Sequence, residues 1–162
     1  MLRTVKTIMI FTVALWGILG AIHNVIDWAG TTGAVAAVTS MATLGEGLQG
    51  WQATSNTLLI WAGALFIMLS KVAAGSLCTL GGVQMWRARA TDNMAFKAAK
   101  QMALSGCAIA MIMLFGGFIV IAEGWFELWR SEVMREPVLG SAFRYGAMIM
   151  LIAIFVSTDD SA

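Results

Sequence analysis

Four long stretches of apolar residues, separated by short polar segments, organise this sequence. They run from Thr7 to Ile26, from Thr57 to Trp86, from Ala98 to Ala122 and from Gly140 to Val156. A helix needs about 20 apolar residues to cross the hydrocarbon core of a bilayer, and each stretch comes near that length. The pattern therefore predicts an all-α integral membrane protein, a four-helix bundle in which residues 1–162 form a single transmembrane domain.

The composition makes lipid the expected solvent for these stretches. Hydrophobic residues make up 59% of the 162 residues and charged residues only 12%. A water-soluble domain of this size could not bury so much apolar surface, because its surface is large relative to its volume. A cleaved signal peptide is disfavoured for the first stretch, since its apolar core is too long and no small-residue cleavage site follows it.

Basic residues are unevenly distributed among the polar segments and predict the orientation. The N-terminus and the second connection with its edges carry Arg3, Lys6, Arg87, Arg89, Lys97 and Lys100. The first connection, residues 30–55, has no lysine or arginine, and the third, residues 123–140, mixes both signs. By the positive-inside rule, both termini and the second connection are expected in the cytoplasm.

Two connections on the expected outer side contain segments that predict short interfacial helices. One lies within residues 34–48. The other is the segment from Glu123 to Val133, where Trp125, Trp129 and Val133 share one helical face. Tryptophan rings settle at membrane–water interfaces, so we interpret these side chains as anchors rather than as a binding site.

Small residues at helical spacing predict how the spans pack. Helices in lipid approach closely where their side chains are small. The expected packing positions are Ser70, Ala74, Cys78 and Gly82 in the second span and Ala103, Gly106, Ala110 and Gly117 in the third. Because the connection between these spans is short, we expect them to be antiparallel neighbours, and the two cysteines need no chemical role.

Five polar residues form a candidate cluster toward the outer half of the bundle: His23, Asn24, Asp27, Lys71 and Glu123. Lys71 lies near the middle of the second span, where a charge costs at least about 2.5–3.5 kcal/mol. Its ammonium could snorkel, lose its proton or pair with the Asp27 or Glu123 carboxylate. The cluster is either a proton, ion or small-ligand site or an ion-pair network that sets helix packing. We favour the packing interpretation.

Residue patterns of known catalytic and cofactor sites do not occur in the sequence. It has one histidine and two cysteines, too few for a zinc site, and no glutamates at di-iron spacing. It also has no phosphate-binding loop, no serine–histidine–aspartate set and no basic run typical of nucleic-acid binding. We therefore expect no cofactor, no metal, no nucleic-acid partner and no enzymatic activity.

Several sequence blocks resemble a bacterial family of small integral membrane proteins of unknown function. The most specific block is FGGFIVIAEGWFELWRS at residues 115–131, followed by AFRY at 142–145. The weaker blocks are HNVIDW at 23–28, SM at 40–41, WQAT at 51–54 and WRAR at 86–89. The resemblance covers nearly the whole chain. It implies a four-span protein of the bacterial inner membrane, and it brings no activity or catalytic residue.

Two functions remain open from the sequence. The leading hypothesis is a non-enzymatic accessory or assembly subunit that works by helix–helix association, with other membrane subunits or further copies of itself as partners besides the lipid bilayer. The small size and small-residue faces motivate it. The alternative is a small transporter or a ligand- or proton-binding membrane protein that uses the polar cluster.

Overall fold

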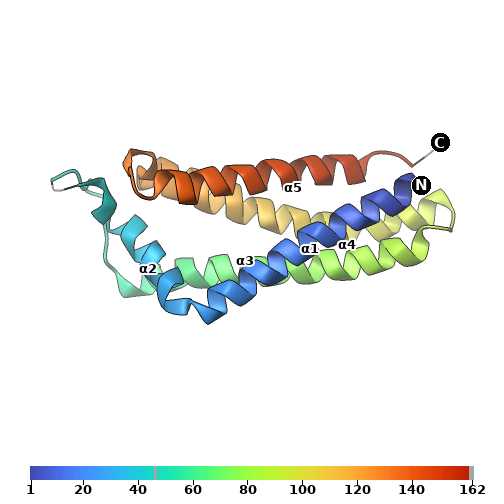
Figure 1. Ribbon diagram of the computed structural model, residues 1–162, viewed down its shortest axis with the longest axis horizontal. Helices are drawn as coiled ribbons and strands as arrows, with labels where there is room; N and C mark the ends of the chain where they lie inside the picture. Colours follow the sequence, from blue (N-terminus) through green and yellow to red (C-terminus); the bar gives the residue numbers. More distant parts are fainter. Residues whose placement is uncertain (46, 161–162) are drawn as a thin grey trace.

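The computed structural model describes residues 1–45 and 47–160, and these form an elongated helical bundle (Figure 1). Its long helices are α1 (Leu2–Ile26), α3 (Thr57–Ala88), α4 (Asn93–Met111) continued by η2 (Ile112–Trp125), and η4 (Arg135–Gly140) continued by α5 (Ser141–Ser157). Its short helices are α2 (Trp28–Thr39), η1 (Ala42–Leu44) and η3 (Leu128–Arg130). Four helical segments are long and apolar enough to cross a membrane, which confirms the predicted all-α, four-span fold class.

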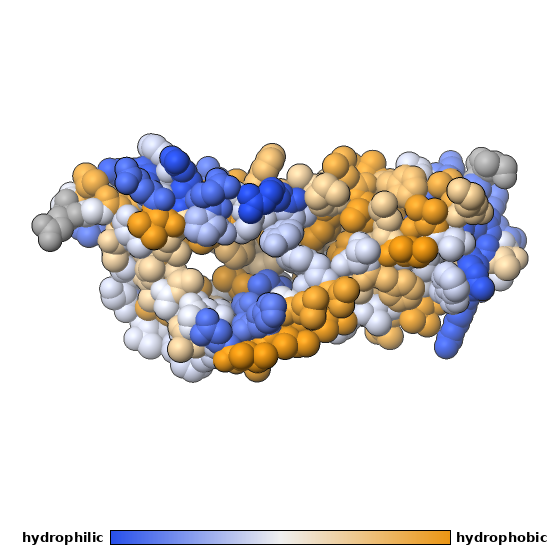
Figure 2. Space-filling model, in the orientation of Figure 1, coloured by the Kyte–Doolittle hydropathy of each residue, from blue (hydrophilic) through white to orange (hydrophobic). Residues whose placement is uncertain are grey.

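The outer surface of the bundle is apolar, as is typical of a membrane protein. Between 22 and 39% of the most apolar window of each long helix is buried within the molecule, so most of each window faces outward. Large side chains such as Leu15, Leu69 and Leu151 are more than half exposed on three different helices. Figure 2 shows the apolar surface on the face in view. In water this surface would be strongly unfavourable, whereas lipid solvates it.

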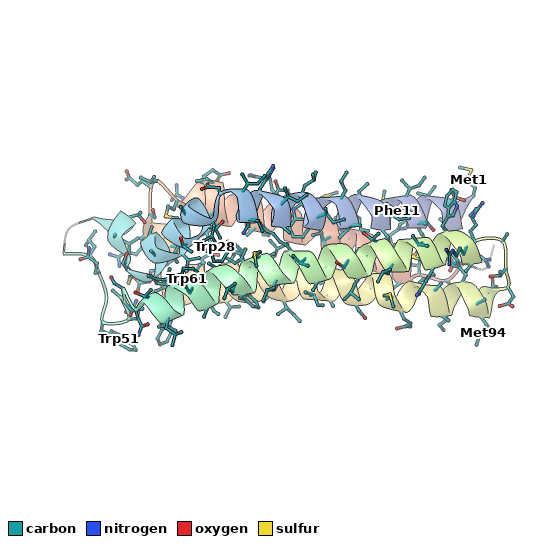
Figure 3. The ribbon with its side chains drawn as sticks, turned by 90° about the horizontal axis from the view of Figure 1, so that it is seen from below. Met1, Phe11, Trp28, Trp51, Trp61 and Met94 are labelled. Carbon is teal, nitrogen blue, oxygen red and sulfur yellow. The ribbon has the colours of Figure 1, made fainter. Side chains whose placement is uncertain are left out.

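The two ends of the bundle differ in structure. Both chain termini and the turn between α3 and α4 lie at one end, here called the terminal end (Figure 1). Helix α2 lies at the opposite end, here called the α2 end. Aromatic rings gather there: Trp28 and Trp61 have ring centroids 5.5 Å apart, and Trp51 and Trp125 are 5.4 Å apart (Figure 3). Such rings are typical of the level where a membrane meets water.

Glycines allow α1, α3 and α4 to pack with their backbones close together. Gly17 of α1 lies against Gly75 of α3, and a Cβ atom on Gly17 would be 2.8 Å from the Gly75 nitrogen. Gly106 of α4 lies against α3 in the same way, because a Cβ atom there would be 2.6 Å from Cys78 Sγ. Dispersion contacts between such surfaces drive helix association in lipid, so α1, α3 and α4 form a tight unit.

The short helix of the first connection occupies different residues from those predicted. The sequence suggested a helix within residues 34–48, whereas α2 spans Trp28–Thr39. It starts early because the Asp27 side chain accepts a hydrogen bond from the Gly30 nitrogen at 2.9 Å and caps its first turn. It ends early because Met41 adopts a left-handed conformation with φ of 54°.

The predicted interfacial helix from Glu123 to Val133 is also wrong as a continuous element. Helix η2 ends at Trp125, Glu127 has a positive φ of 51°, and only the short η3 follows. A left-handed residue interrupts a right-handed helix, so the tryptophans of this segment do not share one helical face. Helix η2 is itself a π-helix of 14 residues, whereas most π-helical segments in proteins are single turns.

The close contact at Gly106 should be sensitive to a single methyl group. We expect Gly106→Ala to destabilise the protein by about 1–3 kcal/mol, because the added Cβ atom forces α3 and α4 apart. Gly116→Ala is the matched control, since no atom lies within 4 Å of its added Cβ atom. Thermal unfolding in mild detergent measures both. Equal unfolding temperatures for the two variants would contradict this account of the packing.

Candidate functional site

Lys71 has an amide partner in the bundle, and no carboxylate partner is found for it among the described residues. Its Nζ atom donates a hydrogen bond to Asn24 Oδ1 of α1 at 2.9 Å, and both side chains are half-buried. The lysine stem crosses Gly20, where a Cβ atom would lie 3.0 Å from Lys71 Cδ. An amide oxygen carries no net charge, so this contact orients the ammonium without neutralising it.

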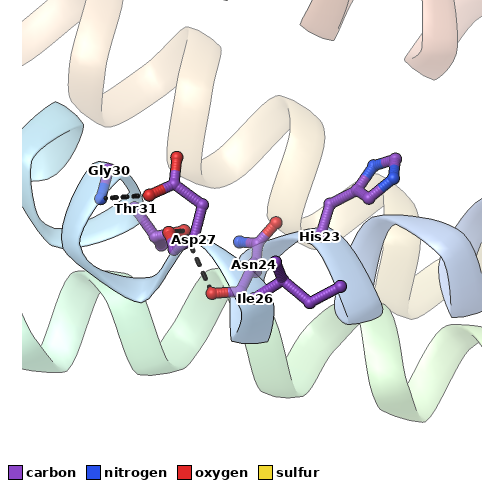
Figure 4. Close-up of a pocket in the computed structure, with 6 residues that line it drawn as sticks. All are labelled: His23, Asn24, Ile26, Asp27, Gly30 and Thr31. Atoms are coloured by element: carbon purple, nitrogen blue, oxygen red, sulfur yellow. Dashed lines mark hydrogen bonds between the residues drawn. The ribbon is translucent and has the colours of Figure 1, made fainter.

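The structure does not join the other predicted cluster residues to Lys71. Asp27 caps α2 through Gly30, and Figure 4 shows the His23 ring pointing away from Asp27 and Asn24. Glu123 is half-buried in η2, and no hydrogen bond or ion pair of its carboxylate occurs within the described part of the chain. Of the five residues, the structure therefore brings together Lys71 and Asn24, with His23 and Asp27 nearby on the same turn of chain.

Lys71 and Asn24 lie at one end of a large cavity of about 560 Å³. This volume falls within the range of roughly 300–1,000 Å³ that is usual for small-molecule sites. The lining is predominantly apolar, and α3 contributes the longest run of it. The lining residues of α3 are Leu59, Ala62, Gly63, Phe66, Ile67 and Lys71. Lys71 is the one ionisable side chain among the described residues that line this cavity.

The wall opposite α3 is built by chain that is not α-helical. Helix η2 contributes Gly117, Phe118, Ile121 and Ala122, and η4 contributes Val138. The Phe126 nitrogen donates to the Ile121 oxygen at 3.0 Å, five residues back, which continues the π-type hydrogen bonding of η2. Departures from α-helical hydrogen bonding inside long helices are frequent at functional sites.

A second, more polar hollow of about 430 Å³ adjoins the first. His23, Asn24, Ile26, Asp27, Gly30 and Thr31 line it, and Asn24 and Thr31 also line the larger cavity (Figure 4). The His23 and Asp27 side chains are exposed there. Figure 2 shows the molecule hollowed in the half that contains α2, with polar residues on both sides of the depression. Asn24, the hydrogen-bond partner of Lys71, thus lies between a polar hollow and an apolar cavity.

A second group of buried charges, which the sequence analysis did not predict, lies at the terminal end. Lys6 Nζ of α1 is 2.9 Å from Asp160 Oδ1, and Lys100 Nζ of α4 pairs with Asp160 Oδ2. Both lysines also donate to the Thr158 carbonyl oxygen, at 2.7 and 2.9 Å. Lys6 is fully buried and Lys100 is 4% exposed. These contacts fasten the residues after α5 to α1 and α4.

The Asp160 carboxyl is held in its charged form. Burial by itself raises the pKa of this group, but the hydrogen bonds and positive charges of Lys100 and Lys6 outweigh that effect. The pKa of Asp160 therefore lies below its ordinary value of 3.8. The ring of Phe96 lies under the Lys100 ammonium at 5.3 Å, and that of Phe155 lies under Lys6 at 5.6 Å. Lys6 Nζ has three oxygen partners and Lys100 Nζ has two, and such paired charges are typical of a structural contact.

The predicted packing positions are found mostly inside the bundle. Ser70, Ala74, Cys78, Gly82, Ala103, Gly106 and Ala110 are buried, and Gly117 is half-buried beside Phe66. Gly82 faces Phe11 of α1 rather than α4, and Gly81 takes the position against Ala103. The contact between Gly17 and Gly75 was not predicted. The spacing of Ala14, Gly17 and Ala21 in the first span could have indicated it.

No three histidine, cysteine, aspartate or glutamate side chains of the described residues come together as metal ligands. The two thiols, Cys78 and Cys107, are buried between helices. Chemically, the larger cavity can hold an apolar molecule and present one ammonium and one amide to it.

Removing the Asp160 charge should loosen the terminal end. Asp160→Asn leaves two buried lysines without a carboxylate, and breaking such a group costs about 3–5 kcal/mol. Because the folded pKa is lowered, this stabilisation is present above about pH 4 and is lost as the pH falls through the folded value. Unfolding of both proteins from pH 7 to pH 3 tests this: their difference should shrink in acid. If the difference in stability between the two proteins stayed constant from pH 7 to pH 3, the charge of Asp160 would have no stabilising role.

The sequence was compared with families, characterised proteins and solved structures. No characterised protein and no solved structure matches it significantly. One family matches residues 2–159 and is described as "Predicted small integral membrane protein (DUF2165)". The match covers nearly the whole chain and agrees with the four membrane-length helices. The chain therefore belongs to this family of small integral membrane proteins.

Proposed function

We propose that this protein is a non-enzymatic binding or transport protein for a small membrane-soluble molecule that carries an anionic group. The ligand occupies the cavity between α2, α3 and η2, with Lys71 as its polar anchor. The observation that carries the proposal is the position of Lys71, because a half-buried ammonium faces an apolar cavity with only a neutral amide as partner. A bound anion would supply the missing counter-charge.

The depth of Lys71 strengthens this argument. Ten residues separate it from Trp61 and fifteen from Trp86, so it lies about 15 Å and about 22 Å along α3 from these two interfacial rings. The backbone at Lys71 therefore lies well inside the span, and its ammonium bonds Asn24, which also lines the polar hollow. Ionisable groups at such depth usually face a cavity and take part in ligand or ion binding.

The cavity supports ligand binding more directly than it supports the accessory-subunit hypothesis. That hypothesis depended on small-residue faces, and these faces are occupied by contacts within the chain, such as Gly106 against Cys78. The outward faces of the long helices carry large side chains such as Leu15, Leu69 and Leu151 instead. Close helix–helix association between chains favours small residues, so these faces suit lipid better.

We further propose that the protein lies in the inner membrane of a bacterium with its terminal end in the cytoplasm. Arg3, Arg87, Arg89 and Lys97 lie at or near this end, and residues 30–55 at the α2 end carry no basic residue. The positive-inside rule places the basic end in the cytoplasm. The ligand cavity then opens in the outer half of the membrane.

Single cysteines test this orientation. Asn93→Cys, at the start of α4, should react with a membrane-impermeant thiol reagent only after the cells are opened. Gln49→Cys, at the α2 end, should react in cells whose outer membrane alone is permeabilised. The native Cys78 and Cys107 are buried and serve as the unreactive background. Labelling of both new cysteines from the same side would contradict the four-span layout.

Matched variants of the cavity test ligand binding. Ala62→Trp fills the cavity, whereas Leu65→Trp adds the same side chain on the same helix outside the residues that line the cavity. Lys71→Met removes the anchor but keeps the length of the side chain. Loss of a charged hydrogen bond worth about 1.5–3 kcal/mol should lower the affinity for the ligand at least about tenfold.

The measurement is mass spectrometry of small molecules extracted from the protein after mild purification. We expect one compound at near-stoichiometric amount in the wild type and in Leu65→Trp, and little of it in Ala62→Trp and Lys71→Met. Identical extracts from all four proteins, or an empty wild type from every gentle preparation, would refute the proposed function.

A further inference from the structure

The length and width of the cavity limit what it can hold. Its α3 wall runs from Leu59 to Lys71, twelve residues or about 18 Å of helix. With a volume of about 560 Å³ over that length, the cavity is longer than it is wide. The occupant is a narrow, elongated molecule.

The wall length matches a lipid chain. One leaflet of a hydrocarbon core about 30 Å thick is about 15 Å deep, which is the reach of one extended acyl chain. The cavity from Lys71 to Leu59 is only slightly longer than this. Apart from Asn24, Thr31, Thr39 and Lys71, its lining consists of apolar side chains and glycine. Both Thr31 and Thr39 use their hydroxyls on backbone carbonyls of α1 and α2, so they offer little to a ligand.

The entrance of the cavity is lipid-facing. Three of its lining side chains are large, apolar and strongly exposed: Leu59 at 54%, Phe66 at 42% and Ile121 at 52%. They belong to α3 and η2, so the cavity borders exposed apolar surface on both of these helices. A molecule dissolved in the membrane could enter by this route without crossing water, which suits a single-chain amphiphile.

The polar end of the cavity recognises a small anion with one charge. Lys71 Nζ uses one proton on Asn24 Oδ1 and has others to donate. The Asn24 amide nitrogen makes no hydrogen bond within the described part of the chain, so it is a second donor beside the ammonium. Two donors and one positive charge match the two oxygens and single charge of a carboxylate. A phosphate, with greater charge and more acceptor oxygens, would leave oxygens unpaired in an apolar site.

We infer that the ligand class is a long-chain monocarboxylic acid, bound with its carboxylate on Lys71 and Asn24 and its chain running along α3 toward Leu59. This inference rests on the proposed function, because it names the ligand of the same cavity. The carboxylate then lies near the centre of the membrane and the chain points toward the α2 end. That direction is opposite to that of an outer-leaflet lipid.

Photo-crosslinking tests both the class and the direction. The probes are two hexadecanoic acids, one with a diazirine near the carboxyl group and one with a diazirine near the methyl end, added to wild-type protein in bilayers of zwitterionic lipid. We expect the first to label residues near Lys71 and Gly117. The second should label residues near Leu59 and Val38. The reversed pattern would overturn the binding direction.

Competition and variants test the recognition of the carboxylate. Unlabelled hexadecanoic acid should compete with labelling at least about tenfold better than hexadecanol or monohexadecyl phosphate. Lys71→Met should weaken labelling by the same factor, and Lys71→Arg should retain it. Removing a charge from hydrocarbon favours insertion, so Lys71→Met is expected to fold. Equal competition by the alcohol, or unchanged labelling of Lys71→Met, would overturn the inference, as would better competition by the phosphate.

The Ala62→Trp and Leu65→Trp pair separates the two proposals. If Ala62→Trp loses labelling and Leu65→Trp keeps it, the acid occupies the cavity. If the wild type binds no hexadecanoic acid but its extract contains another compound that Ala62→Trp lacks, the ligand class is wrong while the proposed function stands. If Ala62→Trp labels like the wild type and its extract is also unchanged, both are wrong.

Discussion

Close contact between helix backbones at glycine is the constraint on which the rest of this structure depends. Gly17 against Gly75 and Gly106 against Cys78 hold α1, α3 and α4 so near each other that added methyl groups would collide. No hydrophobic effect draws helices together inside lipid, so the contact surfaces themselves must provide the attraction. The three helices thus form a unit whose members are held in fixed positions relative to one another.

The cavity results from what this unit leaves unfilled. Near the terminal end, α5 is fastened to α1 and α4 through Asp160, Lys6 and Lys100. Toward the α2 end, Figure 1 shows α1 lying with α3 and away from α5. The π-helical η2 and the returning α2 surround the space between them without closing it. A bundle that is tight at one end and open at the other can hold a ligand without losing its fold.

The two lysine sites differ in the partners that the structure gives to the ammonium group. Lys6 is fully buried, yet its ammonium has a carboxylate, a carbonyl and a hydroxyl oxygen as partners. Lys71 is only half-buried, yet its ammonium has one neutral amide oxygen. Burial alone would rank Lys6 as the more unusual residue. Comparing the partners of the two ammonium groups makes Lys71 the more unusual residue. Its charge has no counter-charge, and this is why we propose a ligand beside it.

The sequence alone determined the fold class, because apolar length and the need to pair backbone groups in lipid leave few alternatives to spanning helices. It also indicated Lys71, Asn24 and the small-residue faces with Ala74 and Cys78 in α3 and Gly106 in α4, because each of these depends on the position or spacing of residues within its own helix. It could not pair Lys6 and Lys100 with Asp160, which are 154 and 60 residues away from them in the chain. Nor could it predict the interruption at Glu127 or the cavity beside Lys71. Those features depend on how separate helices diverge in space, and only the tertiary structure decides the distance between residues that the chain does not connect locally.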